Sequence, residues 1–245
     1  PRLCRDWSSD VCSSDLKYGV NMRNFNDGQI GSRLFMKKMA SMTGKSEKEL
    51  SSRRTHRKYI ELKDCIVEGG VEFEFDGFRG VFEKFMDMTV VNTRKEEDIS
   101  VYYDGMVYHF GFGGLHASRD PGVYRDITSA DVSSYYPNLS IGQRFYPQHL
   151  GEYFCDAYEE IYKERSTFKK GTAENLAFKY ALNIPFGQSN ADWSPFYDPA
   201  YLLKITINGQ LLLAQLCEWI TSANAGRIIM ANTDGVEVDV YDQDK

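Results

Sequence analysis

Apolar and polar positions alternate with two different periods along the first half of the chain. Apolar residues at helical spacing predict two helices over residues 29–63, a region that ends in the basic stretch SSRRTHRKYIELK. Over residues 66–112 the period changes to two, in runs such as VEFEF, MTVVNT and ISVYYDGMVYHF, which predict strands. The Asp-Gly pair in the last run predicts a hairpin turn. The pattern therefore indicates helices followed by a β-rich region.

A helical hairpin is predicted in the second half of the chain. Residues 156–170 and 173–184 carry helical patterns and are separated by Gly171 and Thr172. Thr172 is predicted to cap the second helix, because its side chain can accept a hydrogen bond from the first turn. Pro185 is predicted to end that helix, because it has no N–H to donate.

Strands and one long helix are predicted around this hairpin. The run DITSADVSSYYPNLSI, residues 126–141, predicts a strand that gives way to a turn at Tyr136-Pro137-Asn138. A helix is predicted over much of residues 199–223, despite an unfavourable Asn-Gly pair within it. The run IIMANTDGVEVDV, residues 228–240, predicts a hairpin around Asp234-Gly235. Together these elements indicate an α/β chain of the α+β type.

Composition and charge place the chain among globular proteins with no membrane partner. Of its 245 residues, 42% are hydrophobic and 14% aromatic, which is enough for a sizeable core. No apolar run reaches the length of about 18 residues that a membrane-spanning helix needs. The net charge of −6 argues against indiscriminate coating of nucleic acid, although residues 51–63 are basic. The five cysteines lack zinc-ligand spacing and are interpreted as reduced thiols.

The ends of the chain look like those of a fragment. CRDWSSDVCSSDL, residues 4–16, repeats Ser-Ser-Asp and has neither apolar periodicity nor the regions of a signal peptide. It resembles a translated sequencing adapter, so residues 1–16 are excluded from functional reasoning. The sequence stops at Lys245, shortly after the predicted hairpin. We therefore expect a chain truncated at both ends.

Two segments are similar to sequence motifs of family B DNA polymerases. DVSSYYP, residues 131–137, resembles motif A, in which an aspartate at a strand end is followed by Ser and then by Tyr-Pro. Asp131 and Ser134 fill the first two of these places. KYALNIPFG, residues 179–187, resembles motif B, Lys-x-x-x-Asn-x-x-Tyr-Gly, with Phe186 where tyrosine is usual.

A third segment, ANTDG, resembles motif C, which is usually Asp-Thr-Asp-Ser within a hairpin. Asp234 occupies the place of the principal metal ligand, while Asn232 replaces the first aspartate and Gly235 replaces the serine. Upstream, GFGGLHAS resembles the glycine motif that links the exonuclease and polymerase parts of these enzymes and lies near the template strand. Together with NTDG, this pattern most resembles phage-type members of the family.

The chemistry of phosphoryl transfer gives independent support to this resemblance. The reaction needs two divalent cations roughly 4 Å apart, which activate the attacking hydroxyl and neutralise the leaving group. Mg²⁺ prefers oxygen ligands and keeps waters and phosphate oxygens around it. Asp131 and Asp234 on neighbouring strand ends would supply the protein carboxylates, and the resemblance adds the backbone carbonyl of Val132. Two Mg²⁺ ions are thus the implied cofactors, and Mn²⁺ is expected to substitute.

The incoming nucleotide needs further contacts outside the metal site. Lys179 and Asn183 are four residues apart on one predicted helix, and Arg165 and Lys169 have the same spacing on the preceding one. The resemblance implies that these lysines and the arginine hold the triphosphate, and that Asn183 packs near the base and sugar. It also implies that Tyr136 lies under the sugar and excludes a 2′-hydroxyl. The nucleotide-binding set implied by the resemblance is Ser134, Tyr136, Arg165, Lys169, Lys179 and Asn183.

Contacts to primer-template DNA are predicted at glycines and at the basic stretch. Small residues allow nucleic acid to approach the backbone closely, and clustered cations bind phosphates. The predicted DNA-binding residues are Gly113, Gly114, Gly187, Arg53, Arg54, Arg57 and Lys58. His109 and His116 are predicted to have structural or backbone-facing roles, because this chemistry needs no histidine.

The organisation implied by the resemblance is a polymerase palm with an antiparallel sheet and a helical-hairpin fingers insertion, without the thumb and most of the exonuclease domain. After the artefact at 1–16, the implied segments are the exonuclease tail and linker helices (17–65), the palm with motif A (66–157), the fingers with motif B (158–187) and the palm with motif C (188–245). The implied function is DNA-templated DNA synthesis from dNTPs in a bacterial cytoplasm, encoded by a phage. The sequence identifies no replication accessory proteins.

Each motif also has an ordinary structural interpretation when it is taken alone. Asp234-Gly235 is a common hairpin turn, and single lysines on helices are usually solvated. Three other functions compete with the polymerase. A binding fragment that grips primer-template DNA without turnover is compatible with Asn232 and the truncations. A two-metal nuclease would have no use for the lysine and asparagine of motif B, and a reverse transcriptase would carry a second aspartate at Gly235.

Overall fold

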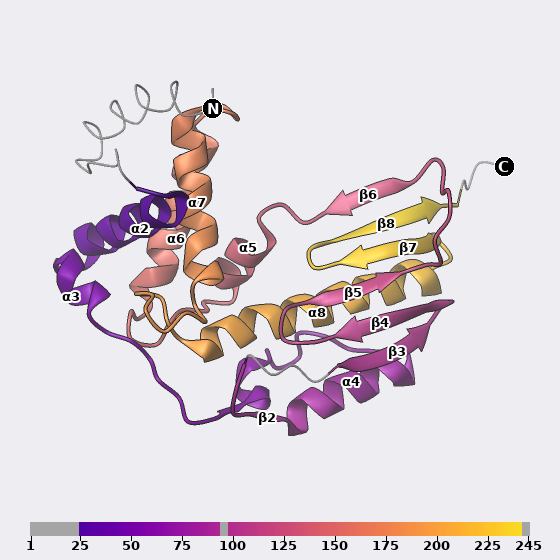
Figure 1. Cartoon of the computed structure of the whole chain (residues 1–245). Coiled ribbons are helices and arrows are strands. Elements are labelled where there is room, and N and C mark those ends of the chain that lie inside the picture. Colours follow the sequence, from indigo (N-terminus) through magenta and orange to yellow (C-terminus); the bar gives the residue numbers. More distant parts are fainter. Residues whose placement is uncertain (1–24, 94–97, 242–245) are drawn as a thin grey trace. The chain divides into compact units, whose positions relative to one another are not determined.

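The computed structural model describes residues 25–93 and 98–241, which form two compact units (Figure 1). Of the described residues, the first unit contains 25–56 and 137–201, and the second contains 57–93, 98–136 and 202–241. The segment boundaries predicted after residues 65 and 157 do not coincide with these limits. The adapter-like residues 1–16 lie outside the described residues.

The first unit is built from helices around an aromatic core. Phe35 packs against Phe154, Tyr158 and Phe196, with ring centroids 4.8–5.4 Å apart. Gly31 allows close helix packing, since a Cβ there would lie 2.6 Å from backbone atoms of Tyr180 on the neighbouring helix. The helices that lie entirely within this unit are α2 (Asp27–Thr43), α3 (Glu47–Ser51), α6 (Tyr153–Ser166) and α7 (Ala173–Gly187).

The ends of the helical hairpin differ in part from the sequence prediction. Thr172 is the N-cap of α7, as predicted, and its side chain accepts a hydrogen bond from the backbone N–H of Asn175. Pro185 does not end the helix, which continues to Gly187. A proline near a helix end removes only one backbone hydrogen bond, and the N–H of Gln188 still donates to the carbonyl of Ile184 at 2.9 Å.

The first half of the chain differs from the sequence prediction in two places. Two helices, α2 and α3, lie where two were predicted, but α3 covers only Glu47–Ser51, and residues 53–59 of the basic stretch have no regular structure. VEFEF, residues 71–75, is not a strand. It leads into helix α4 (Asp76–Asp87), which the sequence reasoning missed.

The second unit contains a six-stranded antiparallel sheet, and an antiparallel two-stranded ribbon of β1 (Ile60–Glu61) and β2 (Thr89–Val90). The order of the six strands is β3-β4-β5-β7-β8-β6. Their bounds are β3, Ile99–Tyr103; β4, Met106–Phe110; β5, Leu115–Ser118; β6, Thr128–Asp131; β7, Gly226–Asn232; and β8, Gly235–Val240. Helices and antiparallel sheets together confirm the α+β class, and the hairpin predicted at Asp104-Gly105 joins β3 to β4.

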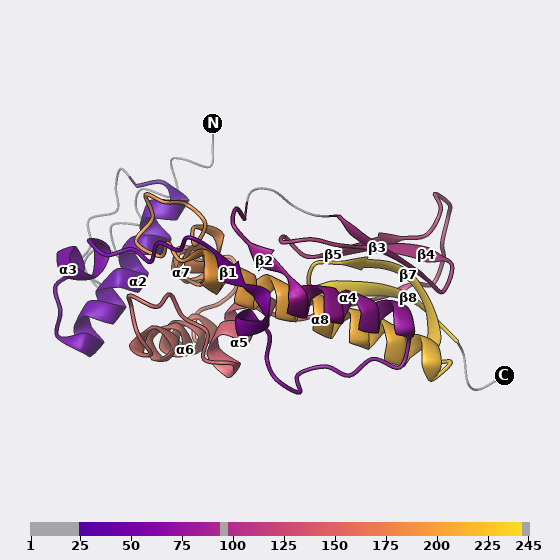
Figure 2. The ribbon, with the colours of Figure 1, turned by 90° about the horizontal axis from the view of Figure 1, so that it is seen from below.

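One face of this sheet is covered by helices and the other is open. Along β4, Tyr108 and Phe110 are buried and pack against Phe78 of α4, whereas Val107 and His109 point to the exposed face. Helix α8 (Pro199–Ser222) lies on the same side as α4 (Figure 2). The open face is therefore the side of the sheet on which a large ligand has access. Among the described helices, none is long and apolar enough to cross a membrane.

Asn208 is part of this long helix and does not break it. Its side-chain amide donates to the carbonyls of Cys65 (2.7 Å) and Lys204 (2.6 Å), and its side-chain oxygen accepts from the N–H of Val67 (2.9 Å). The residue is buried, and these bonds fasten the connection that follows the short 3₁₀ helix η1 (Leu62–Cys65) to the helix. The gain from these tertiary bonds outweighs the low helix propensity of asparagine.

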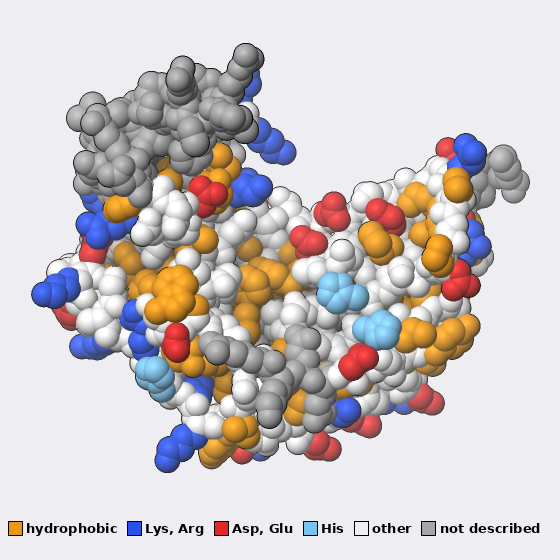
Figure 3. Space-filling model, in the orientation of Figure 1, with side chains coloured by type: hydrophobic (Ala, Val, Ile, Leu, Met, Phe, Trp, Pro, Cys, Tyr) orange, Lys and Arg blue, Asp and Glu red, His pale blue; other side chains and the backbone are white. Residues whose placement is uncertain are grey.

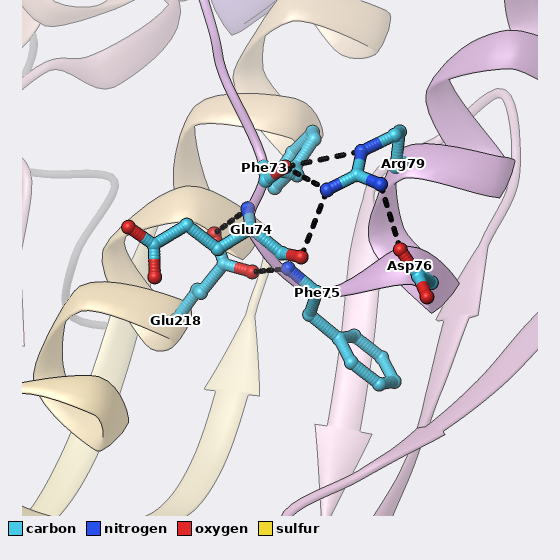
Figure 4. Close-up of polar contacts among 6 residues, drawn as sticks. All are labelled: Phe73, Glu74, Phe75, Asp76, Arg79 and Glu218. Atoms are coloured by element: carbon cyan, nitrogen blue, oxygen red, sulfur yellow. Dashed lines mark hydrogen bonds and ion pairs between the residues drawn. The ribbon is translucent and has the colours of Figure 1, made fainter.

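Glu218 of α8 explains why VEFEF is not a strand. Its buried carboxylate accepts hydrogen bonds from the backbone N–H of Glu74 (3.2 Å) and of Phe75 (2.6 Å), so these groups are not available to a neighbouring strand (Figure 4). Arg79 donates to the carbonyls of Phe73 and Glu74 from the other side. The segment is held in a turn that starts α4.

Replacing Glu218 by alanine is expected to lower the free energy of unfolding by about 2–3 kcal/mol, because two part-buried N–H groups lose a charged acceptor. Glu218→Gln retains one acceptor oxygen and should cost less. Urea titration followed by circular dichroism measures both changes. Glu83 is exposed on α4, and Glu83→Ala is the matched control, with an expected change within about 0.5 kcal/mol. Equal losses for Glu218→Ala and Glu83→Ala would contradict this role of Glu218.

Candidate functional site

Strand pairing in the second unit brings Asp131 and Asp234 to neighbouring strand ends. Asp131 is the last residue of β6, and its partner in the sheet register is Gly235, the first residue of β8. Asp234 directly precedes Gly235, and its carbonyl accepts a hydrogen bond from the N–H of Val132 at 2.9 Å. Both aspartates are exposed. Two carboxylates that are 103 positions apart in the sequence thus lie together at one edge of the open face.

The turn that carries Asp234 is fastened to the sheet. Thr233 has a φ of 57°, and its N–H donates to the carbonyl of Leu115 on β5 at 2.9 Å. The N–H of Asp234 donates to the carbonyl of Asn232 at 2.6 Å. The hydroxyl of Thr233 also donates to the side-chain oxygen of Asn232 at 2.9 Å. Asp234 is therefore a turn residue whose backbone is held in a defined place.

Gly235 leaves the space that the carboxylate of Asp131 occupies. A Cβ built on Gly235 would overlap the Oδ1 of Asp131 and would lie 3.1 Å from the carbonyl oxygen of Ala130. A serine, which is usual at this place in motif C, could not fit here unless the aspartate moved. The sequence indicated Gly235 as a turn residue and as a departure from the motif, without this steric role. Its role becomes visible only through the register of β6 and β8.

The glycine motif and motif A meet beside this turn. The hydroxyl of Tyr136 lies 3.4 Å from the carbonyl oxygen of Gly113, to which it donates. A Cβ on Gly114 would lie 3.5 Å from the Tyr136 hydroxyl and 3.7 Å from the Cα of Thr233. Residues predicted separately from three motifs therefore form one cluster in the second unit.

The turn predicted at Tyr136-Pro137-Asn138 is instead the first part of helix α5 (Tyr135–Gly142). Proline is tolerated in the first helical turn, where its missing N–H has no partner to lose. Ser134, just before the helix, has a φ of 49°. This conformation reverses the chain between the strand that ends at Asp131 and the helix that carries Tyr136.

The environment of Tyr136 keeps its phenol protonated to high pH. Burial, and after it the charge of Asp234, raises the pKa of Tyr136 to about 12. An unfolded tyrosine titrates near pH 10. Because the pKa is higher in the folded state, the stability linked to this group is complete below about pH 10 and is lost as the pH rises through 12.

We expect the pKa of Tyr136 to fall when Asp234 is replaced by asparagine, because the nearby negative charge is removed. An NMR titration of ¹³C-tyrosine rings measures this, with Tyr136→Phe to assign the signal. Asp87→Asn, an exposed position at the end of α4, is the control and should leave this pKa unchanged. An identical pKa in the parent and in Asp234→Asn would contradict the proximity of the two side chains.

The nucleotide-binding residues predicted on the helical hairpin all belong to the first unit. Lys179, Asn183 and Gly187 are exposed on α7, where the spacing of four residues gives them a common face. Arg165 is in α6 and half-exposed. The sequence predicted that Lys169 lies on the same helix as Arg165. It lies outside that helix, because α6 ends at Ser166.

The end of α6 has a specific cause. The side-chain amide of Asn175 donates to the carbonyls of Arg165 (3.3 Å) and Phe168 (3.1 Å). The carbonyl of Lys169 accepts from the backbone and side chain of Thr172. These bonds form a loop in place of a further helical turn, so Arg165 and Lys169 do not share a helix face.

The basic stretch is only partly available for nucleic acid. The guanidinium of Arg54 donates to the carbonyls of Ser51, Arg53 and Trp193, and burial lowers its pKa. Arg54 thus holds the loops of the first unit together. Arg53 is exposed in that unit, and Arg57 and Lys58 are exposed in the second unit, so for these three DNA contact stays a prediction.

His109 and His116 were predicted to have structural or backbone-facing roles, and their side chains do not face the backbone. The two residues are directly opposite each other on β4 and β5, and both are exposed on the open face. The Nδ1 of His109 lies 3.1 Å from the hydroxyl of Ser100 and 3.3 Å from the Oδ1 of Asp98. The alternation of buried and exposed residues along HFGFGGLHAS contained this signal, since each histidine is flanked by apolar residues that point inward.

The donor groups at the Asp131–Asp234 edge fit a hard divalent cation. The two carboxylates and the Val132 carbonyl offer only oxygen, which Mg²⁺ prefers over nitrogen and sulfur. Gly235 leaves room for one of these carboxylates. Within the part of the chain that the structure describes, no group of three or more His, Cys, Asp or Glu side chains is placed to hold a metal ion. An ion here would complete its shell with water or substrate oxygens.

Comparisons with known protein families, with curated proteins and with solved structures find no match to this chain.

Proposed function

We propose that the chain is the palm and fingers portion of a family B DNA polymerase, which adds dNTPs to a primer 3′ end under the direction of a template. The observation that carries the proposal is the adjacency of Asp131 and Asp234. The motif A aspartate ends β6 and pairs with Gly235, the motif C aspartate directly precedes Gly235, and both residues are exposed. An α+β unit with an antiparallel sheet provides this arrangement.

In this proposal Asp131, Asp234 and the Val132 carbonyl would hold two Mg²⁺ ions. Such ions would activate the primer hydroxyl and neutralise the charge that develops on the pyrophosphate. The contribution of the protein is to fix both carboxylates before substrate arrives. The Val132–Asp234 hydrogen bond and the Thr233–Leu115 hydrogen bond supply this preorganisation.

Tyr136 would position the sugar of the incoming nucleotide. Its ring stacks on Tyr135, with centroids 5.8 Å apart, and its hydroxyl is oriented toward Gly113. Tyr135 is itself fixed by a hydrogen bond of 2.7 Å to the carbonyl of Gly209. A neutral, anchored ring beside Asp234 adds no negative charge near a triphosphate. It is also rigid enough to exclude a 2′-hydroxyl by steric contact.

The partners in this proposal are primer-template DNA and dNTPs. The exposed face of α7 formed by Lys179, Asn183 and Gly187 offers a cation and an amide to a nucleotide. A triphosphate needs such cations in addition to metal ions. In the proposal Arg165 and Lys169 contribute further positive charge, although from a helix and a loop respectively.

A second function, primer-template binding without turnover, is favoured by one observation. Asn232 stands where motif C usually has its first aspartate, and its side-chain oxygen is occupied by the hydroxyl of Thr233. An amide carries no charge and contributes less to cation binding than a carboxylate. This alternative retains DNA affinity and predicts no nucleotide incorporation.

Incubation of the full chain with labelled primer-template DNA distinguishes the candidate functions. With Mg²⁺ and one complementary dNTP, a polymerase lengthens the primer by one nucleotide, and a non-complementary dNTP gives no product. A nuclease shortens the DNA without dNTPs. A binding fragment shifts the DNA in a gel without changing its length, and that result would exclude the polymerase activity of this chain.

A further inference from the structure

The strand registers place one row of side chains across all six strands of the large sheet. In the row each residue is the direct cross-strand partner of the next. Direct partners project from the same face of a sheet. The row therefore lies on the open face, and the aspartate of β6 is its last member. From β3 to β6 the row is Ser100, His109, His116, Asn232, Gly235 and Asp131.

Charged side chains in this row are confined to the Asp131 end. Between Asp131 and Ser100 the row contains asparagine, histidine and serine side chains, which are hydrogen-bond donors. Figure 3 views the open face, where histidine side chains (pale blue) lie near acidic ones (red). Asp98, an acidic neighbour of the row, contacts the Nδ1 of His109. Two acidic residues line hollows that His116 also lines: Asp98 lines one of them and Asp120 lines the other.

Two hollows follow the row along the sheet. The larger one has a volume of about 530 Å³ and includes Tyr102, His109, His116 and Asn232 in its lining. The smaller one, about 190 Å³, is lined by the same two histidines and by glycines of the GFGG segment. Tyr102 is 69% exposed at the edge of the larger hollow. Donors, an aromatic ring and accessible backbone are the groups that contact nucleic-acid strands.

His116 is the member of the row that is best placed to contact a ligand. It is exposed, it stands between His109 and Asn232, and both hollows open beside it. Within residues 25–93 and 98–241 its ring makes no hydrogen bond or ion pair. An unpaired ring donor on an open face can bind a phosphate oxygen at no cost to the fold.

We infer that His116, with Asn232 beside it, binds the phosphodiester backbone of the DNA strand whose 3′ end lies at Asp131 and Asp234. The inference rests on the proposed polymerase function. His116 is three strands from Asp131, which is about 14 Å at the usual strand spacing. The contacted phosphate is therefore within the first few nucleotides from the primer end. His116 is thus a DNA-positioning residue outside the chemical step.

Equilibrium binding of a fluorescent primer-template to the full chain tests this contact. Ca²⁺ in place of Mg²⁺ and the omission of dNTPs remove turnover from the measurement. His116→Ala is expected to weaken binding about tenfold, the usual worth of a hydrogen bond to a charged group. His116→Gln keeps a donor and should recover most of the affinity. Met86 is exposed on α4 on the covered side of the sheet, and Met86→Ala is the control with parental affinity.

A chemically altered primer locates the contact. Each primer of a set carries one neutral methylphosphonate, at a different linkage among the first few from the 3′ end. One of them should weaken binding to the parent and should have little further effect on His116→Ala. Parental affinity in a folded His116→Ala, or additive losses from the two changes, would overturn the inference. Primer extension is scored separately. If the parent extends the primer and His116→Ala binds DNA normally, only the inference about His116 is contradicted. If binding depends on His116 but the parent does not extend the primer, only the proposed activity is contradicted.

Discussion

Replacement of Asp234 by asparagine is expected to reduce single-nucleotide primer extension by at least about 10³-fold. The carboxylate would hold cations that stabilise the charge of the transition state, a contribution of several kcal/mol. Each 1.36 kcal/mol of lost stabilisation slows the reaction tenfold. Asp131→Asn should have a similar effect, because Asp131 pairs with Gly235, the residue that directly follows Asp234. Rates from single-turnover quench experiments give the comparison.

The same substitutions should not destabilise the fold. The carboxylates of Asp131 and Asp234 are exposed at neighbouring strand ends, where like charges repel each other. Thermal unfolding should therefore show an unchanged or slightly higher Tm for each variant. Asp87→Asn, on the exposed end of α4, is the matched control and should retain parental extension and Tm. Parental extension by a folded Asp234→Asn would show that this residue is a turn former without a catalytic role.

Replacement of Gly235 by serine is expected to lower extension about 10²-fold, although serine is the usual residue of motif C. A Cβ at this position would overlap the carboxylate of Asp131 and crowd the carbonyl of Ala130. Asp131 would have to move, and a displacement of about 1 Å in a reacting group can cost that factor. Gly235→Ala should have the same effect, because the clash arises from the Cβ.

A matched glycine gives the control for this prediction. Gly80 lies in α4, and a Cβ there has no neighbour within 4 Å. Gly80→Ala should keep full extension and should be slightly more stable, by up to about 1 kcal/mol, because alanine is the better helix former. Extension at the parental rate by Gly235→Ser would mean that the position of Asp131 over Gly235 is not required for activity.

Local sequence patterns predicted those elements whose signals are local. The hairpin at Asp104-Gly105, the hairpin that carries Asp234 and the N-cap at Thr172 are each defined by a few adjacent residues. The pairing of Asp131 with the Asp234 turn was expected from motif resemblance, and the strand register confirms that the two lie together. Short-range turn and capping chemistry therefore determines these parts of the fold.

Other features depend on contacts between residues far apart in sequence. VEFEF alternates like a strand, but Glu218, more than a hundred residues later, binds the N–H groups that a strand would need. The strand register gives rise to two features: the space that Gly235 leaves for the carboxylate of Asp131, and the row that contains His116 and Asn232. No local pattern specifies that register. Packing and pairing across the sheet thus determine what sequence reasoning missed.

Template-directed incorporation of one nucleotide tests the central claim most directly. The full chain, in excess over labelled primer-template DNA at low salt with Mg²⁺, is mixed with each dNTP in turn. The account predicts that only the complementary dNTP extends the primer, and that both Asp131→Ala and Asp234→Ala abolish the product. A folded parent that binds the DNA but adds no nucleotide, or extension that survives both substitutions, would contradict a polymerase site at these two aspartates.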